Sequence, residues 1–245
     1  MHYVFLSPHL DDVALSCGAI VHSLRSQKNI VEVWTIFAGD PPQDRPFPFA
    51  LSLHKRWQLL SNPIGARRIE DAEAMRILDV RFRHFTLPDS IYRVSENNSP
   101  LINKEEDLFQ EIMGNQYQIV DQVAQLIETN LPGSAKLIIP LSIGDHIDHR
   151  ITRAAASKLA FVEKWFFPDF PYVVKNDQDF SDYLPKNVTE LSFCLTEKDI
   201  NTWKKSIVAY HSQISTFWVN EETMIENVDA YVLNGGGKTL WKNDS

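Results

Sequence analysis

The sequence has little of what several large functional classes require. Among its 245 residues there are only two cysteines, and the net charge at pH 7 is −8. Two cysteines cannot build a disulfide framework, which indicates a reducing compartment. Nucleic acids and anionic membrane surfaces are bound by clustered positive charge, so an acidic chain of this kind is not expected to bind either of them.

Long apolar runs are also missing. No stretch approaches the roughly 20 apolar residues that a transmembrane helix needs. Residues 1–6 lack the basic region and the extended apolar region of a secretory signal peptide. We therefore expect a cytoplasmic protein without a membrane span and without a nucleic-acid partner.

The motifs of several common α/β enzymes are absent as well. The chain has only nine glycines, and none of them forms G-x-G-x-x-G or G-x-x-x-x-G-K-[ST]. This excludes the usual fingerprints for dinucleotide and nucleoside triphosphate binding. No G-x-S-x-G occurs, which removes the usual α/β-hydrolase interpretation. The glycine run at 235–237 is predicted to be a loop.

The apolar segments nevertheless predict an α/β fold. A buried strand at 3–6, a helix at 13–24 and a second strand at 30–37 form a β-α-β unit, which implies parallel strands. Further strands are predicted at 80–86, 136–140, 164–167 and 190–195. Helices are predicted at 50–60, 65–78, 104–129 with a break near Gly114, 151–161, and 196–211 with Thr196 as its N-cap. We predict a single domain over 1–245. Its fold would be Rossmann-like and three-layered, with a mostly parallel sheet flanked by helices and the weakest pattern after about residue 173.

Two short turns, each after a predicted strand, combine histidine and aspartate. The first holds His9, Asp11 and Asp12, and the second holds His146, Asp148 and His149. The carboxyl ends of parallel strands share one edge of the sheet, where such folds bind their ligands. Histidine and aspartate are zinc ligands, and three protein ligands plus a water make a catalytic zinc site. The sequence therefore predicts a zinc site at this edge.

The carboxylates of the first turn also have a simpler explanation. An aspartate before a helix is a good N-cap, and acidic residues suit the first helical turn. Capping could account for Asp11 or Asp12, but it does not account for the adjacent His9. In the second turn, Asp148 is expected to orient a histidine ring by a hydrogen bond, as carboxylates near metal-binding histidines commonly do.

The two turns resemble the paired motifs of the PIG-L/LmbE-like zinc-dependent N-acetylglucosamine deacetylases. The family's first motif, (P/A)HPDD, corresponds to PHLDD at 8–12, and its second, HPDH, corresponds to HIDH at 146–149. Leu10 and Ile147 replace the two prolines, while every chemically functional residue is retained. The similarity is closest to bacterial members that read SPHLDD, DAIYR, GxHxDH and EDxPY. It covers residues 2–172 well and the remainder thinly.

The resemblance implies a role for each residue of the two turns. His9, Asp12 and His149 would hold one Zn²⁺ per chain, although other divalent transition metals are compatible with this ligand set. Asp11 would be the general base. His146 would be the acid that polarises the carbonyl oxygen or protonates the leaving amine. Some members have a tyrosine just before the second motif; positions 143–145 here are Ile, Gly and Asp, so another group must assist or His146 must suffice.

Shorter similarities imply substrate-binding residues. Residues 68–70 look like the family's R-x-E segment, 87–89 like its L-P-D loop, and 211–213 like its SQ element. By this resemblance, Arg68, Asp89 and Arg93 would bind the sugar or an adjoining group. A surface charge for Arg68 and a loop cap for Asp89 are the alternatives.

The function implied by the resemblance is that of a metal-dependent N-deacetylase, a hydrolase acting on a linear amide C–N bond. It would remove the acetyl group from an N-acetylglucosamine-type amino-sugar conjugate, a small-molecule partner. Two alternatives stay open: a zinc hydrolase that acts on another amide or ester, and a non-catalytic metal- or sugar-binding protein on the same fold. Asp11 and His146 weigh against the second, because metal binding alone needs neither.

Overall fold

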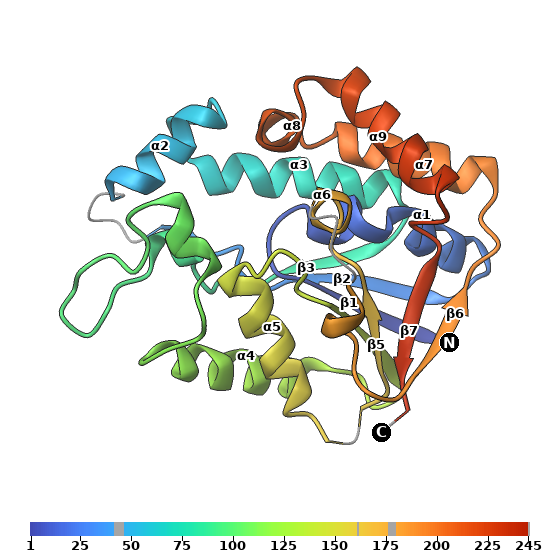
Figure 1. Ribbon diagram of the computed structural model, residues 1–245, viewed down its shortest axis with the longest axis horizontal. Helices are drawn as coiled ribbons and strands as arrows, with labels where there is room; N and C mark the ends of the chain where they lie inside the picture. Colours follow the sequence, from blue (N-terminus) through green and yellow to red (C-terminus); the bar gives the residue numbers. More distant parts are fainter. Residues whose placement is uncertain (42–46, 161, 176–179, 245) are drawn as a thin grey trace.

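A seven-stranded sheet forms the centre of the molecule in the computed structural model, which describes residues 1–41, 47–160, 162–175 and 180–244 (Figure 1). The strand order is β3-β2-β1-β4-β5-β7-β6. The strands are β1 (His2–Ser7), β2 (Ile30–Thr35), β3 (Arg81–His84), β4 (Ala135–Pro140), β5 (Lys164–Phe167), β6 (Val188–Ser192) and β7 (Thr239–Asn243). Strands β1 to β5 pair in parallel, whereas β7 is antiparallel to both β5 and β6. The predicted α/β class with a mostly parallel sheet is confirmed.

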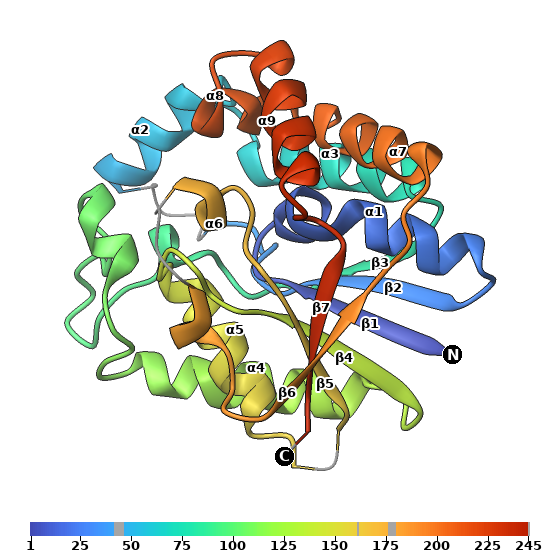
Figure 2. The same ribbon diagram turned by 45° about the vertical axis from the view of Figure 1, so that its right-hand side comes forward.

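Alternation along β1 separates two hydrophobic cores. Tyr3 and Phe5 pack on one face of the sheet, and Val4 and Leu6 pack on the other. All four are buried, because successive side chains of a strand point to opposite faces. One face is covered by α1 (Asp12–Ser26), α3 (Pro63–Ile77) and α7 (Glu197–Val208), and the other by α4 (Gln116–Asn130) and α5 (Ile147–Ser157) (Figure 2). These helices and the sheet make the three layers.

Shorter elements surround the end of the sheet where the parallel strands terminate. Helices α2 (Pro48–Arg56) and α8 (His211–Phe217) lie side by side there (Figure 1). The remaining elements are α6 (Tyr172–Lys175), the 3₁₀ turns η1 (Ser90–Tyr92), η2 (Glu105–Phe109) and η3 (Phe180–Tyr183), and α9 (Glu221–Leu233), which packs against α7 and α8. Within the described residues, no helix combines the length and apolar character needed to cross a bilayer.

The sheet reverses its strand order between β1 and β4. From β1 the chain continues to β2 on one side, and it later returns to β4 on the other side. In open α/β sheets, ligands bind in the crevice at such a switch point. The His9 turn follows β1 and the His146 turn follows β4. The two motifs therefore meet at the crevice, although His9 and Asp148 lie 139 positions apart in the chain.

Part of the secondary structure differs from the prediction. The segment 104–129 is interrupted near Gly114, as predicted, but its first part is only the 3₁₀ turn η2; α4 begins at Gln116, after Gly114 adopts a positive φ of 55°. The helix predicted at 151–161 begins earlier, at Ile147, because His146 occupies the N-cap position.

The C-terminal region contains more structure than its sequence pattern predicted. Helix α9 and strand β7 occupy a region without a clear periodic signal, and β7 is stabilised by pairing with β5 and β6. The N-cap predicted at Thr196 is confirmed, since its hydroxyl accepts a hydrogen bond from the Asp199 amide at 3.2 Å. The glycine run between α9 and β7 is a loop, as expected.

Candidate metal and active site

The turn after β1 is held by Ser7. The Ser7 hydroxyl donates to the His9 carbonyl at 2.7 Å and accepts from the Val13 amide at 3.2 Å. Within this turn Asp11 adopts a φ of 152°, a backbone conformation that residues with side chains rarely adopt. The strand, the turn and α1 together place the side chains of His9, Asp11 and Asp12 at the crevice.

Helix capping does not explain the two carboxylates. Asp11 occupies the N-cap position of α1, but its side chain makes no capping hydrogen bond. The Asp12 carboxylate instead turns back and accepts from the His9 amide at 2.6 Å. The side chains of both residues are therefore available to the crevice, as the metal-site interpretation requires.

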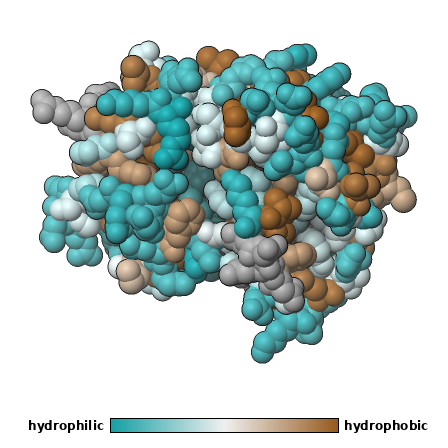
Figure 3. All heavy atoms as spheres, turned by 45° about the horizontal axis from the view of Figure 1, so that its top comes forward, coloured by the Kyte–Doolittle hydropathy of each residue, from teal (hydrophilic) through white to brown (hydrophobic). Residues whose placement is uncertain are grey.

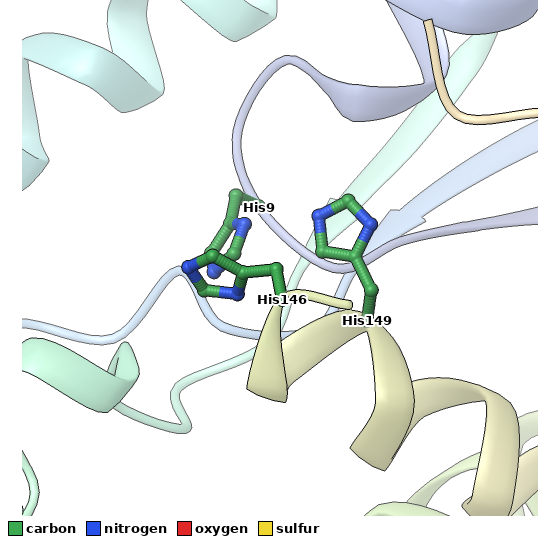
Figure 4. Close-up of side chains that lie close together, drawn as sticks. All are labelled: His9, His146 and His149. Carbon is green, nitrogen blue, oxygen red and sulfur yellow. The ribbon is translucent and has the colours of Figure 1, made fainter. Parts of the chain in front are cut away.

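The histidine rings of both turns converge in the crevice (Figure 4). Asp12 lies between two rings: its Oδ2 is 3.4 Å from His9 Nδ1, and its Oδ1 is 3.3 Å from His149 Nε2. Ring nitrogens of His9, His146 and His149 lie within 4.8 Å of one another. Such a set of imidazoles and a carboxylate, buried together, has the donor chemistry that zinc accepts.

Two buried carboxylates orient the His9 and His149 rings from the side opposite Asp12. Asp148 Oδ2 lies 3.0 Å from His9 Nε2, and Asp169 Oδ1 lies 2.7 Å from His149 Nδ1. Because an ionised carboxylate can only accept, each of these nitrogens carries the proton. When each ring is neutral, the lone pairs of His9 Nδ1 and His149 Nε2 therefore lie on the side of Asp12, the arrangement expected of metal-binding histidines.

Asp148 also belongs to a second cluster of potential ligands, with His9 and Asp89. However, its two oxygens are already occupied. Oδ2 accepts from His9 and from the Ser90 amide at 3.0 Å, and Oδ1 is paired with Arg93. This matches the expected role of a carboxylate that orients a ring, and it leaves the cluster around Asp12 as the better candidate for a metal site.

Asp169 was not predicted as a site residue. It follows β5 directly, at the same edge of the sheet as the two motifs, and it also accepts from the Ile143 amide at 2.9 Å. The position in the chain, immediately after a predicted buried strand, was the available signal. The loosely matched EDxPY segment at 168–172 contains it.

Charges in the crevice shift the protonation of its members. Burial alone would lower the pKa of His149, but Asp12 and Asp169 outweigh it and raise that pKa to about 9. Burial would raise the pKa of Asp12, but the neighbouring His149 and His9 hold it well below its usual range. The side chains therefore favour an ionised Asp12 that attracts a positive charge.

His146 has a different environment. Its Nδ1 accepts a hydrogen bond from the Asp148 amide at 3.2 Å. Burial, together with the charges of His9 and His149, holds the pKa of His146 well below its ordinary value. The ring is consequently neutral near pH 7, with its proton on Nε2, the nitrogen left to donate to a bound group.

Asp11 is paired with Arg67, the neighbour of the predicted Arg68. Arg67 Nη2 lies 3.4 Å from Asp11 Oδ2 and donates to the Leu10 carbonyl at 3.2 Å, while the guanidinium carbon lies 4.7 Å from the centre of the Trp57 ring. Burial raises the pKa of Asp11 to about 7, against the opposing charge of Arg67.

A cavity of about 120 Å³ opens above these groups. In Figure 3 the face that carries α2, α6 and α8 is hollowed near its middle. Besides the two motifs, the walls contain Leu53, Arg56, Trp57, Arg67, Asp89, Ile91, Glu105, Leu108, Phe109, Tyr172, Gln213, Thr216 and Phe217. The metal-site candidates thus form the floor of a small cavity whose walls mix apolar, aromatic and charged side chains.

Only one of the three predicted substrate-binding residues lines this cavity. Asp89 does, and its Oδ1 accepts from the Ile91 amide at 3.1 Å. Arg68 instead donates to the Ala38 carbonyl at 2.8 Å, because adjacent residues of a helix face different directions and Arg67 takes the inward position. Arg93 is buried beneath the cavity, where it pairs with Asp148.

Comparison with known proteins agrees with this geometry. A family model described as PIG-L, GlcNAc-PI de-N-acetylase, matches residues 4–160. The chain is 30% identical over 199 residues to 2'-N-acetylparomamine deacetylase of Niallia circulans, with 74% of this chain and 70% of that protein covered.

Solved structures show the same relationship. The zinc-inhibited form of teicoplanin deacetylase Orf2 superposes with a TM-score of 0.85 at 26% identity, covering 100% of both chains. The A40926 pseudoaglycone deacetylase Dbv21 superposes with a TM-score of 0.76 at 25% identity, covering 98% of this chain and 95% of that one. From the family match and this similarity we conclude that the chain belongs to the PIG-L (GlcNAc-PI de-N-acetylase) family.

Proposed function

We propose that this protein is a zinc-dependent N-deacetylase that removes the acetyl group from an N-acetylglucosamine-type amino-sugar conjugate. One observation carries the proposal: His9 Nδ1 and His149 Nε2 are both directed at Asp12 by carboxylates behind them, with Asp11 and His146 beside them. Two relatives are named as deacetylases, one of acetylparomamine and one of teicoplanin, and these names support the proposed reaction and the proposed substrate class.

In this proposal His9, Asp12 and His149 hold one zinc ion. When bound, zinc acts as a Lewis acid that lowers the pKa of water to near 7 and polarises a carbonyl group. Asp148 and Asp169 keep the two rings in the tautomers that zinc requires.

Asp11 takes the proton of the attacking water in the proposed reaction. A general base works best when its pKa lies near the working pH, and burial raises the pKa of Asp11 into that range. As the C–O bond to the acetyl carbon forms and the C–N bond breaks, the proton held by Asp11 passes to the leaving nitrogen. The products are acetate and the free amine.

His146 donates Nε2–H to the carbonyl oxygen while negative charge develops there. A fixed donor in a buried site stabilises this charge more than water does. The depressed pKa of His146 supports hydrogen-bond donation by a neutral ring over transfer of a proton from a charged one. Of the two functions expected for His146, polarisation of the carbonyl is the one we propose.

A cytoplasmic location is also part of the proposal. Cys17 and Cys194 are both unpaired, which fits a reducing compartment.

The experiment is to assay acetate release by the purified protein from a panel of N-acetylglucosamine conjugates, with elemental analysis alongside. We expect amine formation on at least one conjugate and about one zinc per chain. Parallel simple amides and esters test the alternative of a hydrolase with another substrate. Bound zinc without hydrolysis of any amide or ester would support the non-catalytic alternative and contradict the proposal.

A further inference from the structure

Helix α8 presents one face to the cavity. Gln213, Thr216 and Phe217 all line it, and they lie at positions i, i+3 and i+4 of the helix. Ser215, between them in sequence, is exposed and borders a separate hollow. No residue of this inward face is charged. This face therefore offers uncharged polar groups and one aromatic ring.

The position of α8 is fixed by α3. Glu70 accepts two hydrogen bonds from Ser212, from its amide at 2.9 Å and from its hydroxyl at 2.6 Å. Glu70 is one turn of α3 beyond Arg67, which pairs with Asp11. Helix α3 therefore contacts Asp11, the proposed base, through Arg67, and it contacts α8 through Glu70. The distance between Asp11 and α8 is set by this one helix.

The hydrogen bonds between Glu70 and Ser212 also determine which way the Gln213 amide points. The Ser212 hydroxyl donates its only proton to Glu70, so it must accept from Gln213, whose Nε2 lies 2.9 Å away. The Gln213 nitrogen is therefore directed at Ser212, and Oε1 is left as the free acceptor. No donor in the described part of the chain is hydrogen-bonded to Oε1, although Gln213 is only 4% exposed.

Thr216, one turn further along α8, also has a polar atom without a hydrogen-bond partner. Its Oγ1 is buried and has no hydrogen-bond partner within the described residues. Buried polar atoms in proteins are nearly always paired, so the buried, unpaired Thr216 hydroxyl indicates that a ligand supplies its partner, and the free Gln213 oxygen lies one turn away on the same face. An acceptor and a hydroxyl, without a nearby charge on the same face, match hydroxyl groups better than they match an anionic or cationic group.

We propose, on the basis of the proposed deacetylation, that α8 is the sugar-binding wall of the cavity. Gln213 Oε1 accepts a hydrogen bond from a ring hydroxyl of the amino sugar, and the Thr216 hydroxyl pairs with a second polar group of the same ring. Phe217 supplies apolar surface beside them. Asp89 lies in the remaining wall, so the ring is held from more than one side while its acetamide reaches the floor.

The test replaces each polar group by an apolar one of similar shape. Gln213→Met and Thr216→Val should each raise KM for an N-acetylglucosaminide roughly 3- to 10-fold, the loss expected for one hydrogen bond between uncharged groups. The kcat and the zinc content should stay those of the parent. Ser215→Ala, on the outer face of the same helix, is the matched control and should behave like the parent.

A second substrate separates binding from a structural effect. N-acetylcyclohexylamine has the acetamide and a six-membered ring but no hydroxyl groups, so Gln213→Met and Thr216→Val should leave its kinetics unchanged. Equal losses on both substrates, or an unchanged KM for the sugar, would overturn the inference.

A direct measurement of sugar binding tests this inference independently of the proposed reaction. If the parent releases no acetate from any sugar, the proposed function fails, and calorimetric titration with N-acetylglucosamine then decides the role of α8. Binding that weakens 3- to 10-fold in Gln213→Met supports the sugar-binding wall. Equal binding by parent and variant, or no binding by the parent, overturns it.

Discussion

His149 Nδ1 lies 2.7 Å from Asp169 Oδ1, and this contact decides which nitrogen of the ring faces the cavity. With one proton held on the Asp169 side, Nε2, which faces Asp12, is the nitrogen that can release its proton to an incoming metal ion. A residue outside the two histidine-aspartate turns therefore controls the availability of a proposed metal ligand.

Loss of Asp169 should weaken metal binding. Asp169→Ala removes the group that orients His149, and replacement of such partners typically reduces metal affinity 10- to 100-fold. Competition with a chromophoric chelator measures the affinity for Zn²⁺. Asp121→Ala, which removes an exposed carboxylate on α4, is the control and should leave it unchanged. Parent-like affinity in Asp169→Ala would show that His149 is not a ligand.

The two adjacent carboxylates should respond differently to substitution. Asp12→Ala deletes a proposed ligand, so the zinc content should fall and activity should be lost with it. Asp11→Asn preserves size and shape, so zinc should stay bound while kcat falls by the roughly 10²- to 10⁴-fold that a general base contributes. Elemental analysis measures the zinc content of each variant, and acetate release measures its activity. Near-normal turnover by Asp11→Asn would exclude its role as the base.

Metal binding should strengthen with rising pH. In the metal-free site the pKa of His149 is raised to about 9, so below this pH an incoming ion must displace a proton. Burial lowers the pKa of His9, but Asp89 and Asp12 outweigh it and raise that pKa too, so apparent zinc affinity should increase at least tenfold per pH unit up to about pH 9 and then level off. Titrations between pH 6 and 9 measure the slope, and calorimetry in buffers of different ionisation enthalpy counts the protons released. A slope of zero over this range would contradict the prediction.

Gly144 should tolerate no side chain. It has a φ of +89°, and a Cβ there would lie 2.7 Å from an atom of the Tyr172 ring. Gly144→Ala should therefore destabilise the fold by about 1–2 kcal/mol from the backbone conformation alone, and it should displace the loop that carries His146. Urea denaturation and acetate release measure the two effects. Gly133→Ala is the control, since nothing lies within 4 Å of its added Cβ. Equal stability of the two variants would argue against this role for Gly144.

The cap of α7 offers a test away from the site. Thr196→Ala removes a hydroxyl that accepts from the Asp199 amide and should reduce the free energy of unfolding by about 1 kcal/mol. The zinc content should not change. Lys198→Ala, an exposed change in the same turn, should have almost no effect on stability. The prediction fails if the two variants unfold at the same urea concentration.

Local patterns were sufficient to predict much of the fold. Alternating and continuous apolar runs identified the parallel strands, and the Thr196 signal identified the start of α7, because these features depend on neighbouring residues. The motifs at 8–12 and 146–149 could be assigned to one edge of the sheet, since the carboxyl ends of parallel strands meet there. The choice of His9, Asp12 and His149 as ligands within these turns came from the family resemblance.

Other features depended on contacts between distant parts of the chain. Strand β7 exists because β5 and β6 pair with it, and no periodicity within residues 239–243 encodes that partner. Which of Arg67 and Arg68 faces Asp11 depends on the rotation of α3 relative to β1. The orientation of the Gln213 amide depends on Glu70, which lies 142 positions from Ser212 in the chain. The sequence alone thus determined which chemical groups the site contains, whereas tertiary packing decided their tautomers, their partners and the wall they face, because those properties arise only between surfaces that meet after folding.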